Sequence, residues 1–227
     1  MLLDMTCLSR LVISVHLINC KRVLDKRIER LDALVFRELM ATKKSKRIKH
    51  ISICEGVVSS LWQTWCHFCR SVVVHSTLGA FTSSGRVVCS NYAHLDERQI
   101  ITLAIKLSRS ERIPSYIPMA NGWVDLAWGD TEKLNKIITG IDMSNKEILL
   151  SAFGSVKHLQ SLQKSRNACS HISKYTIEQL KDMRVFYNNN SLMHPVDVMF
   201  WTVPETGRFL WKSWLDEMDL ISSIIIE

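Results

Sequence analysis

The sequence predicts an all-α fold: a helical bundle with an irregular insertion at about residues 79–129 and a C-terminal helical extension at about 191–227. The 227 residues suffice for one large domain, and 47% of them are hydrophobic, enough for an ordinary core. The 8 glycines and 4 prolines are too few for the many tight turns of an all-β protein. Apolar residues also recur at helical spacing. We therefore expect a single helical domain over residues 1–227.

The beginning of the chain predicts two long helices. Residues 21–41 form an amphipathic pattern with charged residues on the other faces. The apolar positions of this pattern are Leu24, Ile28, Leu31 and Val35. A polar connection at 42–47 leads into a more buried helix at about 51–78, and Gly79 is a natural stop for that helix.

The middle of the chain predicts a loop region that contains short helices. Residues 79–95 are rich in glycine and serine, which is typical of a loop or a short hairpin. Asp96 is placed to begin a helix that runs to about Leu107. After an irregular segment at 108–129, Asp130 is placed to cap a short helix that ends at Gly140.

The last third predicts several shorter helices. Two pairs have the spacing of a capping box: Ser144 with Glu147, and Thr176 with Gln179. We expect the polar stretch Gln160–Ser165 to end the first of these helices or to form a turn, and a separate helix at about Arg166–Lys174. Asparagines 188–190 end the next helix, Pro195 and Pro204 bracket an apolar segment, and a helix at 208–221 closes the chain.

Cysteine usage and hydropathy predict a cytoplasmic protein without a membrane partner. The seven cysteines are odd in number, scattered, and in a chain too long for a disulfide scaffold, so we interpret them as reduced thiols. Asp4 and Arg10 interrupt the apolar N-terminus, which argues against a signal peptide. No stretch reaches the ~18 apolar residues of a membrane span.

The net charge of +7 is concentrated in residues 21–50, which hold 11 Lys and Arg against four Asp and Glu (11 − 4 = +7). A basic strip of this kind attracts polyanions, chiefly nucleic acid. The residues that we assign to RNA binding are Arg30, Lys43, Lys44, Lys46, Arg47 and Lys49. The alternative is a solvated helix face followed by a basic loop.

Motif searches exclude several classes of enzyme and predict no cofactor. Cys66 and Cys69 have the C-x-x-C spacing of zinc or redox sites, but a second ligand pair is lacking and the motif lies among aromatic residues. Core thiols are the favoured interpretation, with metal binding as the alternative. Phosphate-loop, dinucleotide-binding, serine-hydrolase and zinc-protease motifs do not occur.

The segment Arg166-Asn-Ala-Cys-Ser-His171 carries the functional prediction. It resembles the R-x4–6-H motif of the HEPN superfamily, in which a polar residue follows the arginine. Two other segments match R-x4–6-H, Arg10 to His16 and Arg70 to His75, but neither has an asparagine after the arginine. Asn167 and His171 are four residues apart and share a helix face.

The resemblance implies a metal-independent endoribonuclease that leaves a 2′,3′-cyclic phosphate. His171 is then the general acid and base, Arg166 stabilises charge on the phosphate, and Asn167 positions both. It also implies a homodimer that pairs two motifs, and a toxin or effector of a prokaryotic toxin–antitoxin or antiviral defence system with a restraining partner protein. The alternative is a non-catalytic helical subunit that binds nucleic acid or serves as a scaffold.

Overall fold

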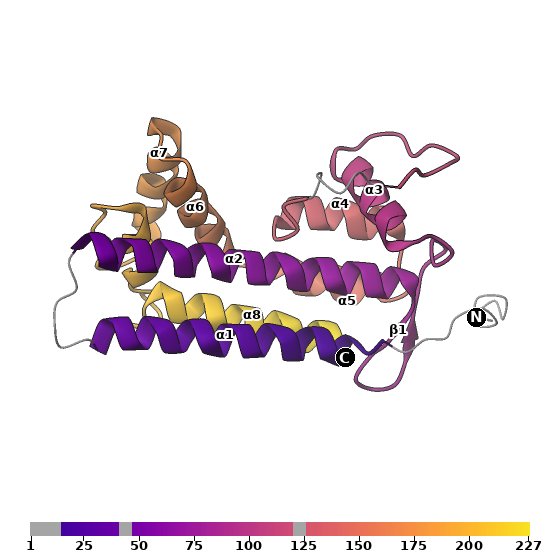
Figure 1. Ribbon diagram of the computed structural model, residues 1–227, viewed down its shortest axis with the longest axis horizontal. Coiled ribbons are helices and arrows are strands. Elements are labelled where there is room, and N and C mark those ends of the chain that lie inside the picture. The colour runs from indigo at the N-terminus through magenta and orange to yellow at the C-terminus, as the bar shows by residue number, and fades with distance from the viewer. Residues whose placement is uncertain (1–14, 41–46, 120–125) are drawn as a thin grey trace. The chain divides into compact units, whose positions relative to one another are not determined.

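The computed structural model describes residues 15–40, 47–119 and 126–227, without the side chain of Arg47 (Figure 1). Helices dominate, and the strands in these ranges form one two-stranded sheet, so the expected all-α fold is confirmed. The polar connection expected at 42–47 lies almost entirely outside the described residues.

The contacts divide the chain into two compact units. Unit 1 comprises the described parts of 1–23 together with 67–155 and 222–227, and unit 2 comprises those of 24–66 and 156–221. The boundaries fall inside three helices: α1 (Leu17–Met40), α2 (Arg47–Leu78) and α8 (Leu210–Ile226). The single domain expected over residues 1–227 stays a prediction.

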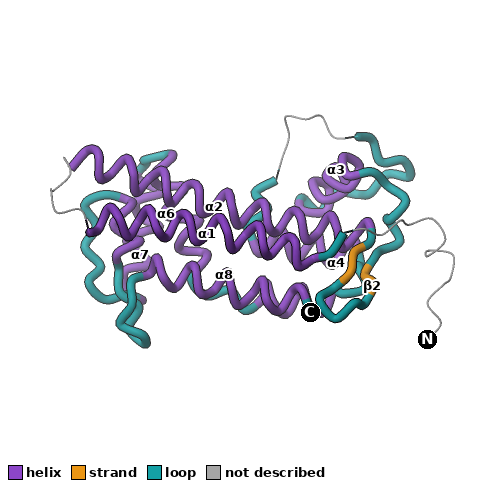
Figure 2. Tube along the Cα trace, turned by 60° about the horizontal axis from the view of Figure 1, so that its bottom comes forward, coloured by secondary structure: helices purple, strands orange, loops and turns teal. Residues whose placement is uncertain are grey.

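Unit 2 is built on the segments of α1, α2 and α8 that belong to it, which run side by side (Figures 1 and 2). The Asp32 carboxylate of α1 accepts hydrogen bonds from Trp211 Nε1 at 2.9 Å and Lys212 Nζ at 2.6 Å, both on α8. Apolar side chains from all three helices are buried in this unit: Leu24, Val35, Val57, Val58, Leu61, Leu210 and Trp214. Burial of such side chains stabilises the fold by roughly 1.5–3 kcal/mol each.

The rest of unit 2 consists of α6 (Leu159–Ser170), α7 (Lys174–Met183) and two 3-10 helices, η1 (Arg184–Phe186) and η2 (Pro195–Phe200). Helix α6 packs against α7 and η2. The amide groups of His158 and Leu159 donate to the Glu217 carboxylate of α8 at 2.9 and 2.7 Å, so this carboxylate caps the start of α6.

These boundaries correct four expectations. The polar stretch Gln160–Ser165 lies inside α6, because its capping group comes from a distant helix and leaves no local signal. The helix expected at Arg166–Lys174 is wrong, since α6 ends at Ser170 and α7 begins at Lys174. The capping box of α7 is made by Ser173 and Thr176 rather than by Thr176 and Gln179, and α7 ends at Met183, before the asparagines expected to stop it.

Unit 1 holds the irregular insertion and its neighbours. Strands β1 (Ala80–Phe81) and β2 (Val87–Val88) form an antiparallel hairpin, shown in orange in Figure 2, which agrees with one of the two expectations for this segment. Asp96 caps α3 (Glu97–Ser108) as expected, through a hydrogen bond from the Gln99 amide. A clearly irregular segment follows in 109–119.

The two remaining helices of unit 1 are α4 (Thr131–Ile141) and α5 (Lys146–Gly154). Asp130 caps α4 as expected. The capping box expected at Ser144 is wrong: its hydroxyl accepts the Cys89 amide at 3.1 Å, and α5 begins after Asn145 without a side-chain cap. None of the helices in the described ranges has the length and apolarity needed to cross a bilayer.

Candidate functional site

The Arg166–His171 motif lies at the C-terminal end of α6, within unit 2. Arg166 and Asn167 belong to the last turn of the helix, and the Arg166 Nη1 donates to Asn167 Oδ1 at 3.2 Å. His171 follows the helix as its C-cap residue, and its amide donates to the Asn167 carbonyl at 2.9 Å. The structure thus brings Arg166 and Asn167 into contact and places His171 directly after the helix, with a non-helical backbone (φ −141°).

The three side chains differ in their exposure. His171 is exposed, whereas Arg166 and Asn167 are half-buried. The Nε of Arg166 is buried, and among the described residues it has no hydrogen-bond partner. A buried donor without a partner costs about 1–3 kcal/mol of folding stability, so the fold is destabilised by holding the guanidinium in this position. Three of its five N–H donors are neither the buried Nε–H nor the one that binds Asn167. This arrangement suits a cation that meets an anionic group from outside.

The surface around the motif has a positive charge that the sequence analysis missed. Residues 156–190 hold six Lys and Arg against two Asp and Glu (6 − 2 = +4). The basic residues are Lys157, Lys164, Arg166, Lys174, Lys181 and Arg184. They are spread through the segment rather than gathered in a run, and they lie on or next to α6, α7 and η1, of which α6 contacts α7 and α7 contacts η1.

Exposed aromatic side chains accompany these cations. Tyr175 on α7 is 68% exposed, and Phe186 in η1 is also 68% exposed. Cations interleaved with exposed aromatic rings are typical of surfaces that bind single-stranded nucleic acid, because the rings stack on unpaired bases.

A cavity of about 350 Å³ opens at the N-terminal half of α6. Its walls include Ser161 and Lys164 of α6, Met183 at the end of α7, and Phe186 with Tyr187 at η1. The volume lies in the range of small-molecule sites. The cavity therefore has room for a ligand of nucleotide size.

The basic strip predicted in residues 21–50 is described only in part. Arg30 on α1 and Lys49 on α2 are exposed, which is compatible with either a nucleic-acid contact or a solvated face. Lys43, Lys44, Lys46 and the side chain of Arg47 lie outside the described residues. Their assignment to RNA binding stays a prediction.

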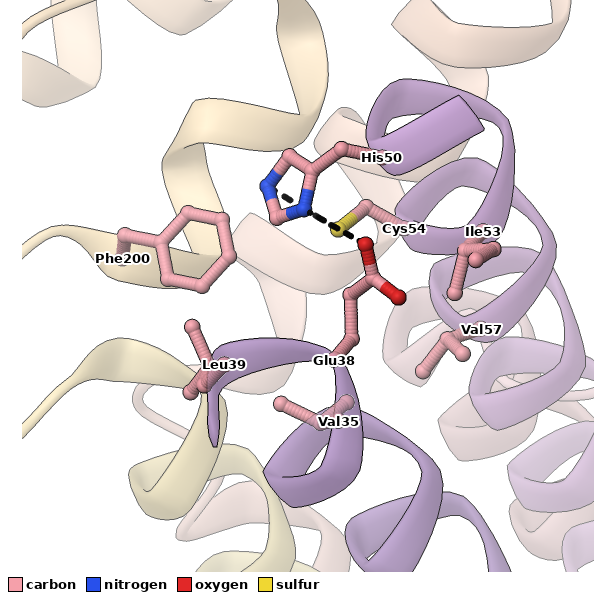
Figure 3. Close-up of a pocket in the computed structure, with 8 residues that line it drawn as sticks. All are labelled: Val35, Glu38, Leu39, His50, Ile53, Cys54, Val57 and Phe200. Carbon is pink, nitrogen blue, oxygen red and sulfur yellow. Dashed lines mark hydrogen bonds and ion pairs between the residues drawn. The ribbon is translucent and has the colours of Figure 1, made fainter. Parts of the chain in front are cut away.

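A second polar cluster in unit 2 has the order of a cysteine hydrolase. Figure 3 shows Glu38, His50 and Cys54: the carboxylate lies 3.2 Å from His50 Nδ1, and His50 Nε2 lies 3.7 Å from Cys54 Sγ. In a cysteine hydrolase, a carboxylate orients an imidazole base, which in turn lies beside a thiol nucleophile, and these three groups have the same spatial order. The His50 ring is stacked on Phe200, with centroids 6.0 Å apart.

The surroundings of this second cluster exclude that chemistry. Cys54 is 3% exposed, and burial, reinforced by the charges of Glu38 and Asp197, raises the pKa of its thiol to about 11. The cavity beside it measures about 10 Å³, room for about one water molecule. A neutral, enclosed thiol cannot attack a substrate.

The C-x-x-C pair lies on α2, with Cys69 buried and Cys66 half-buried. Among the residues that the structure describes, no group of three or more His, Cys, Asp or Glu side chains could hold a metal ion. The burial of Cys69 fits the interpretation of the motif as part of the core.

No family model, curated protein or solved structure matches this chain. Its function is therefore argued from the arrangement of its own residues. Of the two clusters in unit 2, only the one at the end of α6 combines solvent access with positive charge.

Proposed function

We propose that this chain is a metal-independent endoribonuclease of HEPN type, with Arg166, Asn167 and His171 as its reacting groups. The observation that carries the proposal is the hydrogen bond that fixes the Arg166 guanidinium on Asn167 at the end of α6, one turn before an exposed histidine. A fixed guanidinium next to an accessible imidazole is the minimum that phosphodiester cleavage without a metal requires.

The reaction transfers the phosphoryl group within one strand. The 2′-oxygen forms a bond to the adjacent phosphorus, the bond from phosphorus to the 5′-oxygen breaks, and a 2′,3′-cyclic phosphate and a 5′-hydroxyl result. His171 accepts the 2′-hydroxyl proton or gives a proton to the leaving 5′-oxygen. Arg166 donates to the phosphate oxygens, where negative charge accumulates in the transition state.

One histidine in the motif supplies one proton-transfer group, whereas the reaction uses both a base and an acid. The proposal therefore includes a homodimer in which two copies of the α6 end face one cleft. It also includes a cytoplasmic role as a toxin or defence effector that a partner protein restrains. The basic, aromatic surface favours a second candidate, a non-catalytic subunit that binds nucleic acid, since binding alone needs no reacting group.

Cleavage of a labelled RNA by the purified full chain, in EDTA, tests the proposal. We expect His171→Ala to lower the single-turnover rate about 10²–10⁴-fold, the usual contribution of a general acid or base. His94→Ala is the matched control, because His94 is an exposed histidine of unit 1. Cleavage that needs a metal, or an equal rate for wild type and His171→Ala, contradicts the proposal. RNA binding without cleavage by the wild type supports the non-catalytic candidate.

A further inference from the structure

Two chemically different kinds of side chain line the cavity at the N-terminal half of α6. Some are aromatic or apolar: Phe186 is 68% exposed, while Tyr187 and Met183 are 9% and 6% exposed. Others are the cations Lys157 and Lys164. An exposed ring beside a cavity offers a stacking face, and lysines at the same cavity offer point charges for a phosphate.

A network of neutral polar groups connects three of the lining residues, His158, Ser161 and Tyr187. The Tyr187 hydroxyl lies 3.4 Å from His158 Nδ1. Ser161 Oγ donates to the His158 carbonyl at 2.6 Å and accepts from Trp214 Nε1 at 2.9 Å. This wall therefore presents hydrogen-bonding groups that are already held in position.

Burial keeps these groups uncharged near neutral pH. It lowers the pKa of His158, and the charge of Lys157 acts in the same direction, against the carboxylates of Glu217 and Glu205. Burial also raises the pKa of the Tyr187 phenol. Neutral donors and acceptors match the edge of a base, whereas they would not hold a second charged group.

A phosphate on the ligand has to bind the lysines that line the cavity. The amides at the start of α6, which could otherwise bind an anion, already donate to the Glu217 carboxylate. Lys157 Nζ is paired with Glu205 Oε1 at 2.9 Å, so a phosphate competes with this carboxylate for it. Lys164 also lines the cavity. Among the described residues, no carboxylate forms an ion pair with Lys164 that a phosphate would have to displace.

The cavity and the proposed cleavage site lie on the same helix. Lys164 lines the cavity, Asn167 follows three residues later on the same face of α6, and His171 is the residue after the end of the helix. Seven residues of helix span about 10 Å, comparable to roughly three stacked nucleotides at ~3.4 Å each. A strand held in the cavity can therefore follow α6 to His171.

We propose that this cavity binds one unpaired nucleotide of a single-stranded RNA, with its base stacked on Phe186 and its phosphate at Lys164. The inference rests on the proposed RNA substrate and adds where the strand is held. Duplex RNA does not fit this description, because its bases are stacked and paired and cannot reach an aromatic side chain.

Fluorescence anisotropy of a labelled single-stranded 12-mer RNA tests the inference, with the full chain carrying His171→Ala and with EDTA present. Phe186→Ala is expected to weaken binding about 5- to 100-fold, the range for loss of one stacked base. Lys164→Gln is expected to weaken binding and to reduce the slope of log K against log salt by about 0.7, the value for one phosphate of a single strand. Glu205→Gln is expected to tighten binding, because it releases Lys157.

Matched controls come from unit 1. Tyr116 is 72% exposed, and Lys136 lines a different, open cavity on α4. Tyr116→Ala therefore removes an exposed aromatic ring elsewhere, and Lys136→Gln removes a lysine charge at another cavity. Both are expected to bind the 12-mer as the parent protein does. Thermal unfolding of each variant checks that the fold is retained.

The outcomes separate the cavity from the nuclease. If Phe186→Ala and Lys164→Gln bind the 12-mer like the parent, the cavity assignment is wrong even where His171-dependent cleavage is found. If these variants weaken binding while the wild type never cleaves RNA, the cavity stands and the nuclease proposal fails. Binding of free AMP or of the same 12-mer as a duplex, as tight as that of the single strand, overturns the assignment to single-stranded RNA.

Discussion

Unit 2 contains two clusters of potentially reactive side chains, which share a histidine but differ in their other residues, their solvent access and their charge. The Glu38–His50–Cys54 cluster has a complete set of carboxylate, base and nucleophile, yet it is enclosed beside a cavity of about 10 Å³ (Figure 3). The Arg166–Asn167–His171 cluster lacks a nucleophile, yet it ends in an exposed histidine on a basic surface. Access and charge, rather than the presence of a nucleophile, favour the second cluster as the site.

The electrostatic surroundings of the Glu38–His50–Cys54 cluster explain why it is unreactive although it contains a carboxylate, a base and a nucleophile. A reactive cysteine needs nearby positive charge that stabilises its thiolate. Cys54 is buried and is influenced by the carboxylates of Glu38 and Asp197, which raise the pKa of the thiol further. The hydrogen bonds among these residues therefore contribute to the packing between α1 and α2 rather than to chemistry.

After His171→Ala, the largest effect that distinguishes the clusters is expected from Arg166→Ala in the RNA cleavage assay. Loss of a donor to a developing oxyanion lowers a rate by about 10²–10³-fold. Arg166→Lys keeps the charge but lacks the planar fork that Asn167 fixes, so most of the loss is expected to remain.

Cys54→Ala is the matched variant in the enclosed cluster, and its single-turnover rate is expected to equal that of the wild type. The roles of the two clusters are reversed if Cys54→Ala abolishes cleavage while Arg166→Ala leaves it intact. The rates are measured with saturating enzyme, so that a lower affinity for RNA does not lower the measured rate of the chemical step.

A second, smaller effect is expected in the alkylation of Cys54 by iodoacetamide. With the pKa raised to about 11 from 9.0, the thiolate fraction at pH 8 is about 100-fold lower than in the unfolded chain, and burial slows the reaction further. Mass spectrometry of the Cys54 peptide, in buffer and in urea, measures both rates. The rate of the folded protein is expected to rise about tenfold per pH unit up to about pH 11. Faster alkylation in the native state than in urea would identify an activated nucleophile.

The sequence predicts the fold better than it predicts the site. Local signals were sufficient where they are contained in a few neighbouring residues, as in the caps at Asp96 and Asp130. They failed for α6, whose start is stabilised by Glu217 from a helix nearly 60 residues away. As a result, the motif was expected at the start of a helix, whereas it lies at the end of one.

The site shows the same limit. The R-x4-H pattern singles out Arg166 and His171, but the lysines around them are separated by up to ten residues, so the charge is gathered only by tertiary packing. The cavity and its exposed Phe186 likewise depend on how α6 packs near η1. The Glu38–His50–Cys54 cluster joins α1 to α2, and no motif or spacing in the sequence predicts that these two helices bring the three residues together.

The smallest effect that sharpens the comparison is expected in the alkaline stability of the fold. The Cys54 pKa is higher in the folded protein, at about 11, than the ordinary 9.0. Between these values the folded chain keeps a proton that the unfolded chain has released, so the free energy of unfolding falls as pH rises from 9 to 11 and is fully retained below pH 9.

In Cys54→Ser, which has no titrating group there but can still donate to His50, this fall is expected to be smaller by about 2 kcal/mol. Urea unfolding of both proteins from pH 8 to pH 11 measures the difference. Cys20, whose pKa is also raised, contributes equally to both proteins, whereas the part of the rise at Cys169 that comes from Cys54 is lost together with this thiol. Parallel curves for the two proteins would mean that the Cys54 thiol is not held in its neutral form, and the main distinction between the two clusters would be lost.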